Sequence, residues 1–212
     1  MSARAFDGYD IVSDERVGDG GFLRIRRLRL RVRRPDGSLS GEGLYDFVER
    51  PMGADAVVVV LWQRAPGGPR VLLRHAPRVP LWFRDPALGR EHTELVAGII
   101  EKGEEGWLAI QKRAAAEAHE EAGLAVDAAA VEPLGPASFP TAGMFSELFH
   151  FVAVEVADPA IAVAPPTDGS PFEEGASLEW VALDEALRRC DAGEIRDLKT
   201  ELALRRLRAK IG

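Results

Sequence analysis

The chain has 212 residues, 46% of them hydrophobic, which suits one good-sized domain with a small N-terminal addition. Its net charge of −7 argues against general attraction to nucleic acid or an anionic membrane, and no apolar run approaches the roughly 18 residues that a membrane-spanning helix needs. The single cysteine, Cys190, excludes an internal disulfide and a cysteine zinc site, so we expect oxygen ligands for any metal. Because the N-terminus lacks a signal-peptide pattern, we expect a cytoplasmic protein.

The first predicted elements form an N-terminal antiparallel β-hairpin or meander. Residues 22–34 alternate arginine with aliphatic residues, the pattern of a strand with one wet face, and residues 43–49 form a second strand after a PDGS turn. The arginines indicate either a solvated sheet face or a patch that receives substrate phosphates or a partner subunit. We assign residues 1–52 to this region and residues 53–212 to one larger domain.

The larger domain is predicted to begin with a buried strand. Residues 54–62 form a β-branched run typical of a strand covered on both faces, and residues 71–73 should pair with it across the APGGP turn. Residues 77–90 are rich in proline and arginine and predict a loop, and residues 94–100 predict a short strand.

One long helix and further mixed elements follow. Ala, Glu, Lys and Arg dominate residues 108–122, and Gly123 suits a left-handed cap that ends the helix. The remaining predictions are strands at 131–138, 147–156 and 177–183, a loop at 158–175, and helices at 184–190 and 196–210. This order is typical of an α+β fold in which helices pack against a mixed sheet.

Three carboxylates share one edge of the predicted helix. Glu117 and Glu121 are four residues apart, and Glu120 is three residues after Glu117. Such like charges repel one another in a bare helix, whereas a divalent cation would turn them into an oxygen-ligand site. The alternative is a solvated helix face, but the upstream residues Gly98, Gly103 and Glu104 favour a metal site.

These residues resemble the Nudix box, GX5EX7REUXEEXGU, where U is aliphatic. Gly98 and Glu104 match its first half, and EAHEEAGL at residues 117–124 matches its second half except that Ala118 occupies a U position. The segments ELVAGIIEKGE and GEIRDLKTELAL also resemble the ADP-ribose pyrophosphatase branch, and the resemblance covers residues 8–208 with gaps. It implies a Nudix-type α/β/α sandwich with a mixed sheet, plus the N-terminal meander.

Two departures from the box are evident. About four extra residues lie around residues 105–109, and Ala116 stands where the family has an arginine that orients the glutamates. Arg113 lies one helical turn before Glu117 and could supply a substitute guanidinium; the alternative is a surface charge and a weakened site.

The resemblance implies a Mg²⁺ site, with Mn²⁺ as an alternative cation. Glu117 and Glu121 would be the principal ligands, beside Glu120 and the carbonyl of Ala97, while Glu104 would be an accessory ligand or would brace the loop. A metal-activated water would be the nucleophile.

The general base is predicted on the FPTAGMFSELFHF segment. Our candidate is Glu147, and the catalytic set is therefore Glu147, Glu120 and Arg113. Glu147 could instead be a solvated residue at the end of a strand, in which case Glu173 and Glu174 are the alternative bases.

The same branch implies how the substrate binds. Its N-terminal strands are exchanged within a homodimer, and an aromatic residue stacks on adenine; Phe22 matches that position, although a core phenylalanine is the alternative. Arg50 and Arg78 are candidates for contacts with the diphosphate, and the match at Arg78 requires a one-residue shift.

The predicted function is cleavage of the pyrophosphate bond of a nucleoside-diphosphate sugar, with ADP-ribose giving AMP and ribose 5-phosphate. The alternatives are hydrolysis of a UDP- or GDP-sugar, or a nucleotide-binding sensor with little turnover, which Ala116 and the insertion favour. The chain contains no HExxH, GxSxG or P-loop pattern, so other hydrolase chemistries are not indicated. The expected partners are the small-molecule substrate and a second subunit.

Overall fold

The computed structural model describes residues 8–18, 20–157 and 176–212, and the chain divides into two compact units. The N-terminal unit comprises Met1–Ala54 and Thr141–Glu147. The main unit comprises Asp55–Pro140 and Leu148–Gly212. The short segment 141–147 therefore belongs with the N-terminal strands, although it lies far from them in sequence.

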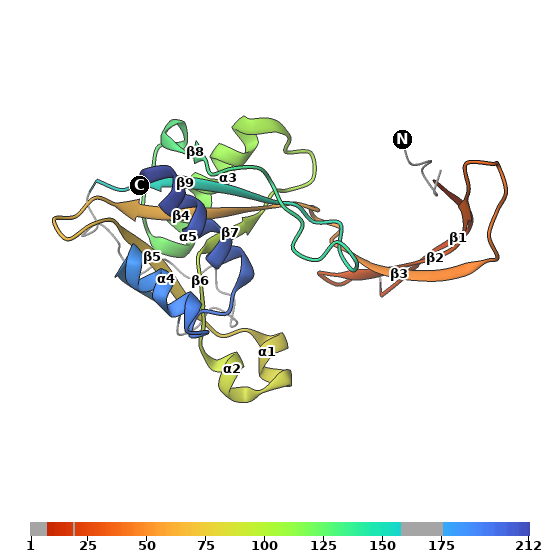
Figure 1. Ribbon diagram of the computed structural model, residues 1–212, viewed down its shortest axis with the longest axis horizontal. Helices are drawn as coiled ribbons and strands as arrows, with labels where there is room; N and C mark the ends of the chain where they lie inside the picture. Colours follow the sequence, from red (N-terminus) through yellow and green to blue (C-terminus); the bar gives the residue numbers. More distant parts are fainter. Residues whose placement is uncertain (1–7, 19, 158–175) are drawn as a thin grey trace. The chain divides into compact units, whose positions relative to one another are not determined.

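The N-terminal unit is built on a three-stranded antiparallel sheet. Its order is β1 (Gly8–Val17), β2 (Arg24–Arg33) and β3 (Gly43–Glu49), so the predicted antiparallel meander is confirmed (Figure 1). Strand β1 was not predicted. Its pairing register with β2 shifts between Ile11 and Ser13, and such an irregularity interrupts the two-residue alternation that identifies a strand in sequence.

The arginines of β2 are paired with carboxylates of the same unit. Arg27 lies 2.7 Å from Asp46 on β3, and Arg26 lies 2.7 Å from Asp14 on β1. These exposed ion pairs contribute little stability individually, but they neutralise much of the positive charge on the strand. The arrangement favours a solvated sheet face over an open phosphate-binding patch.

The main unit contains a mixed sheet. Its main path runs β10-β5-β4-β9-β8, with β6 paired to β5 and β7 paired to β4; β4 and β9 are parallel and the other pairs are antiparallel. The strands are β4 (Ala56–Gln63), β5 (Arg70–Ala76), β6 (His92–Glu94), β7 (Val96–Ile99), β8 (Glu132–Pro133), β9 (Phe149–Glu155) and β10 (Ser177–Ala182).

Helices cover both faces of this sheet (Figure 1). Helix α3 (Gly106–Ala122) packs through Ala114, Ala118 and Ala122 on the face that includes Val57. Helices α4 (Leu183–Asp191) and α5 (Leu198–Ile211) pack on the opposite face, which includes Val58. Because successive strand residues point to opposite faces, the β-branched run of β4 supplies both cores, and every residue of β4 is buried.

The sheet splits near its centre. Strand β4 pairs with β5 only at Trp62–Val71 and Gln63–Arg70; beyond these pairs β4 takes β7 as its neighbour and β5 takes β6. The short strand predicted for residues 94–100 is present as β7, but Leu95 separates it from β6, to which Glu94 belongs. The backbone N–H of Leu95 donates to the Thr200 hydroxyl of α5 at 2.9 Å, which holds the chain at the split.

Two other local predictions need correction. The segment predicted as a loop at residues 77–90 contains the short helices α1 (Val79–Arg84) and α2 (Pro86–Arg90), whose prolines occupy first-turn positions where proline is tolerated. The strand predicted at residues 131–138 is reduced to β8 and follows a 3-10 turn, η1 (Ala128–Ala130).

Helix α3 ends as predicted, at Gly123 with φ of 65°, but begins at Gly106 rather than at residue 108. The loop predicted at residues 158–175 lies outside the described residues. In the part of the chain that the structure describes, no helix is both long enough and apolar enough to span a membrane.

Candidate active site

Gly98 of β7 allows α3 to approach the sheet closely. A Cβ atom added at this position would overlap the side-chain carboxylate of Glu117 on α3, so a residue larger than glycine cannot occupy it without moving that carboxylate. Glu117 is buried, with 9% of its surface exposed. The two halves of the predicted box are thus in direct contact.

Glu121 lies beside the backbone of Ala97. The Ala97 N–H donates to Oε2 of Glu121 at 3.0 Å. Ala97 is paired with Val58 of β4, and its N–H points away from that strand toward α3. In an antiparallel strand the N–H and C=O of one residue point to the same side, so the Ala97 carbonyl also faces the split in the sheet, on the side of Glu121.

Arg113 of α3 lies close to three carboxylates. Its guanidinium lies 3.0 Å from Glu101, 3.2 Å from Glu104 and 3.9 Å from Glu117. The backbone N–H of Glu101 and the Arg113 guanidinium lower the pKa of Glu104, which keeps that side chain anionic. The structure therefore brings Arg113 together with Glu104 and Glu117, as expected for a substitute of the missing arginine.

The insertion in the box extends the N-terminus of α3. Helix α3 begins at Gly106, eleven residues before Glu117, so the extra residues around 105–109 largely form the first turn of the helix. About four residues equal roughly one helical turn, and the added length therefore leaves the face of the downstream glutamates unchanged. Glu120 lies on the same helix and its side chain is exposed.

Arg74 of β5 lies on the other side of the split. Its guanidinium is 3.6 Å from Oε1 of Glu121 and 3.6 Å from Oε1 of Glu94, and only 4% of its side chain is exposed. Glu94 also pairs with Arg78, which was predicted to contact diphosphate and is 45% exposed. Sequence analysis missed Arg74 and Glu94; an arginine within the apolar run VLLRHA was the available signal.

A second acidic cluster joins β6 to the start of α5. Ligand atoms of His92, Glu94 and Asp197 lie within 4.8 Å of one another, a spacing that could suit a metal ion. However, the Lys199 ammonium already lies 2.7 Å from Glu94 and 2.9 Å from Asp197. We interpret the cluster as a structural clamp, because Asp197 also accepts the backbone N–H of Thr200 and caps α5.

The charges in this clamp support one another. Burial alone would raise the pKa of Glu94 and Asp197 and lower that of Lys199. The Lys199 ammonium and the Arg78 guanidinium together outweigh burial for Glu94. The imidazole of His92, Lys199 and the hydroxyl of Thr200 do so for Asp197, so both carboxyl pKa values fall below their usual range. Their negative charges raise the pKa of Lys199 in turn.

The N-terminal unit brings three other predicted residues together. Arg50 forms an ion pair with Glu147, and each side chain is 8% exposed. The Arg50 guanidinium also lies 5.6 Å from the ring centre of Phe22 and 5.3 Å from that of Phe145. Phe22 itself is 59% exposed, so it is not a core residue in this chain. Glu173 and Glu174 lie outside the described residues.

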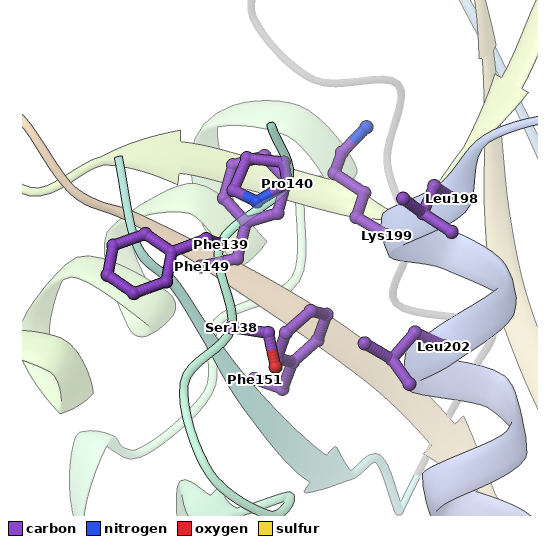
Figure 2. Close-up of a pocket in the computed structure, with 8 residues that line it drawn as sticks. All are labelled: Ser138, Phe139, Pro140, Phe149, Phe151, Leu198, Lys199 and Leu202. Atoms are coloured by element: carbon purple, nitrogen blue, oxygen red, sulfur yellow. The ribbon is translucent and has the colours of Figure 1, made fainter. Parts of the chain in front are cut away.

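A small pocket lies between the 138–140 segment, β9 and α5 (Figure 2). Its walls are mainly apolar, and the side chains of Phe149 and Phe151 belong to the core face covered by α4 and α5. Figure 2 shows the Lys199 ammonium directed away from the Phe151 ring. The pocket is thus on the face of the sheet opposite to α3. Its lining residues are Ser138, Phe139, Pro140, Phe149, Phe151, Leu198, Lys199 and Leu202.

The fold class is α+β of the Nudix type, with a mixed sheet between helices and an antiparallel N-terminal meander, as predicted. A solved structure described as an ADP compounds hydrolase is similar over 98% of this chain and 96% of that chain, with a TM-score of 0.69 and 14% sequence identity. No protein-family model and no curated protein sequence matches the chain. Likeness at this level of identity establishes the shared fold alone.

Proposed function

We propose that the protein hydrolyses the pyrophosphate linkage of a nucleoside-diphosphate compound with the help of a divalent cation, and that ADP-ribose is split into AMP and ribose 5-phosphate. The observation that supports this most is the contact of Glu117 with Gly98 together with the hydrogen bond from Ala97 to Glu121. The description of the similar structure as a hydrolase of ADP compounds agrees with a function of this class.

The donor set fits a hard cation. Glu117, Glu121 and the Ala97 carbonyl offer oxygen atoms at one edge of α3, and Mg²⁺ prefers oxygen ligands; Mn²⁺ accepts the same set. Glu104 and Glu120 would be accessory ligands. When bound, the cation would stabilise negative charge on the diphosphate and acidify a water molecule. A bound cation would also account for the three acidic side chains that lie close together on one helix.

Arg113 would orient the glutamates in place of the missing arginine. It contacts both Glu104 and Glu117, so the change to Ala116 does not leave the acidic residues without a guanidinium partner. Ala116 and the insertion in the box are the features that favour the alternative function, a nucleotide-binding sensor with little turnover. The contacts of Arg113 favour catalysis over that alternative.

Arg50 and Phe22 would bind the nucleotide. Among the described residues, Nε and Nη1 of Arg50 have no hydrogen-bond partner although both atoms are buried, and a guanidinium in this state suits a phosphate oxygen. The exposed ring of Phe22 could stack on a base, an interaction that contributes about 1–3 kcal/mol. Arg78 is a further candidate for contact with the diphosphate.

Glu147 remains our candidate for the general base. Nη2 of Arg50 pairs with one carboxylate oxygen of Glu147, and a diphosphate bound at the other nitrogens of the guanidinium would compete for its positive charge and make the carboxylate a stronger base. This competition would link binding of the substrate to activation of the base. Glu120, exposed on α3, would then assist by contributing charge next to the cation.

We further propose a homodimer with exchanged N-terminal strands. The three-stranded sheet of the N-terminal unit exposes several large apolar side chains, including Ile11 and Leu44. Covering these side chains with a second copy would stabilise a sheet that is small for an independent unit. Light scattering on the full chain should give twice the mass of one chain; a monomer at micromolar concentration would exclude the exchange.

The function is tested with a substrate panel and one variant. ADP-ribose, UDP-glucose and GDP-mannose are incubated with and without Mg²⁺, and AMP, UMP or GMP release is measured. We expect Mg²⁺-dependent AMP release from ADP-ribose and its loss by more than about 100-fold in Glu121→Gln, because a direct ligand matters at least as much as an outer one. The matched control is Glu132→Gln, an exposed carboxylate paired with Lys210.

The outcomes separate the alternatives. Faster release of UMP or GMP would reassign the substrate but keep the reaction. Nucleotide binding without turnover of any compound would replace catalysis by the sensor function. Activity of Glu121→Gln within a few-fold of the parent enzyme would reject the metal site.

A further inference from the structure

We propose that Arg74 is a positioning residue for this reaction: it holds the Glu121 carboxylate in the orientation from which it binds the cation. The inference rests on the proposed function and adds to it a residue that lies outside the Nudix box. Arg74 acts through Glu121 and has no direct contact with substrate in this assignment.

The position of Arg74 follows from the strand pattern. Arg74 is two residues after Leu72, whose side chain packs in the core on the α3 face, so both side chains point toward α3. In the pairing of β5 with β6, Arg74 lies directly opposite Glu94. The guanidinium is therefore placed between α3 and β6, at the split in the sheet.

Two different groups fix the two oxygens of Glu121. The Ala97 N–H donates to Oε2 at 3.0 Å, and Nη2 of Arg74 lies 3.6 Å from Oε1. Contacts at both oxygens define the plane of a carboxylate, whereas the backbone donor alone would let it rotate. Glu117 is fixed in another way, by the close packing on Gly98 and by Arg113. Each principal glutamate thus has its own arginine.

Arg74 is itself held in place. Its Nη1 lies 3.6 Å from Glu94, and the other oxygen of Glu94 accepts a hydrogen bond from Lys199 at 2.7 Å. Because Lys199 belongs to the clamp at the start of α5, the chain of charges Glu121, Arg74, Glu94 and Lys199 connects the metal-binding edge of α3 to α5. With 4% of its side chain exposed, Arg74 has little freedom to adopt another orientation.

A positioning role and a purely electrostatic role of Arg74 predict opposite changes in cation affinity when Arg74 is removed. Removing a positive charge next to Glu121 should by itself tighten cation binding, because repulsion between Arg74 and the cation disappears. Removing a group that orients the ligand should weaken binding, and losses of such supporting groups typically cost about 10–100-fold in metal affinity or activity. The sign of the change therefore identifies the role.

The test is Mn²⁺ binding to the full-length protein in the absence of substrate, measured by electron paramagnetic resonance. For Arg74→Gln we expect Mn²⁺ affinity to fall by about 10-fold or more, and kcat for ADP-ribose to fall while KM stays within about two-fold. Arg70→Gln is the matched control, because Arg70 lies on the same strand and donates to the Trp180 carbonyl. Equal or tighter Mn²⁺ binding by Arg74→Gln would overturn the proposal.

A second variant decides the case if Arg74→Gln does not fold. Arg74→Lys keeps the charge but lacks the planar fork that reaches two carboxylates, so it should fold and still bind Mn²⁺ more weakly than the parent protein. Parent-like affinity and turnover in Arg74→Lys would refute the positioning role. Failure of the proposed function would look different. The parent protein would then turn over no ADP compound, and any Mn²⁺ that it bound would bind equally well to Glu121→Gln.

Discussion

Replacing Gly98 by alanine tests the contact on which the candidate site depends. Gly98 is in an extended strand and is not among the glycines with positive φ, so alanine introduces no backbone strain. Its only direct effect is the new methyl group, which would overlap the Glu117 carboxylate. Since non-bonded heavy atoms prefer separations of about 3.5–4.0 Å, that carboxylate must move by roughly 1 Å or more.

A displacement of this size should be far more visible in activity than in stability. Overpacking costs about 1–3 kcal/mol, which a domain with about 5–15 kcal/mol of stability survives. A misplacement of about 1 Å in a catalytic group can reduce the rate by about 100-fold. We therefore expect Gly98→Ala to remain folded and to lose about 100-fold in kcat/KM for ADP-ribose.

The measurement combines steady-state hydrolysis at saturating Mg²⁺ with thermal unfolding followed by circular dichroism. Gly67→Ala is the matched control, because a methyl group there meets no atom within 4 Å and Gly67 has no positive φ. Gly98→Ala with kcat/KM within about three-fold of the control would refute the argument that Glu117 must lie against the strand.

Two further predictions concern the charges around the site. Arg113→Ala should lower kcat by about 10–100-fold, because Glu104 and Glu117 lose the guanidinium that orients them, and its neighbour Lys112, changed to alanine, is the control; an unchanged rate would return Arg113 to the role of a surface charge. The pKa of Asp197 is lower in the folded state than in the unfolded state, so its contribution to stability is complete above about pH 5 and is lost as the pH falls through the folded pKa. The pKa of Lys199 is raised, so the contribution of Lys199 is complete below about pH 10 and is lost only as the pH rises through its folded pKa. Urea unfolding from pH 7 down to pH 3 should therefore show a smaller loss of unfolding free energy in Asp197→Asn than in the parent protein; parallel losses would contradict the clamp.

Local sequence patterns were sufficient to predict the main helix, α3, and the central strand, β4. Residues 108–122 and 54–62 have compositions that indicate their structure without help from the rest of the chain, and both were predicted within about two residues. The break at Leu95 could not be predicted, because it depends on a hydrogen bond to Thr200 more than a hundred positions later. Local features concealed other elements: the register shift in β1, and the first-turn prolines of α1 and α2.

The candidate site was predictable where its members lie close together in sequence. The resemblance carried by the residues from Gly98 to Glu121 predicted the acidic edge of α3, and helical geometry placed Arg113 next to Glu117. Arg74 and Glu94 were missed because strand pairing and the split sheet, rather than spacing, bring them to Glu121. A charged residue inside an otherwise apolar strand is the signal that would have identified Arg74.

Ala97 belongs to two environments at once. Its side chain packs into the core covered by α4 and α5, while its backbone faces the acidic residues of α3. The choice of amino acid at this position is therefore set by the volume available in one layer, whereas its carbonyl, which every amino acid possesses, serves the opposite layer. A mutation in the α5-side core that shifts Ala97 would move the carbonyl that we propose as a metal ligand without changing any residue on the α3 side. Variation far from the acidic edge would then tune the affinity for the proposed cation.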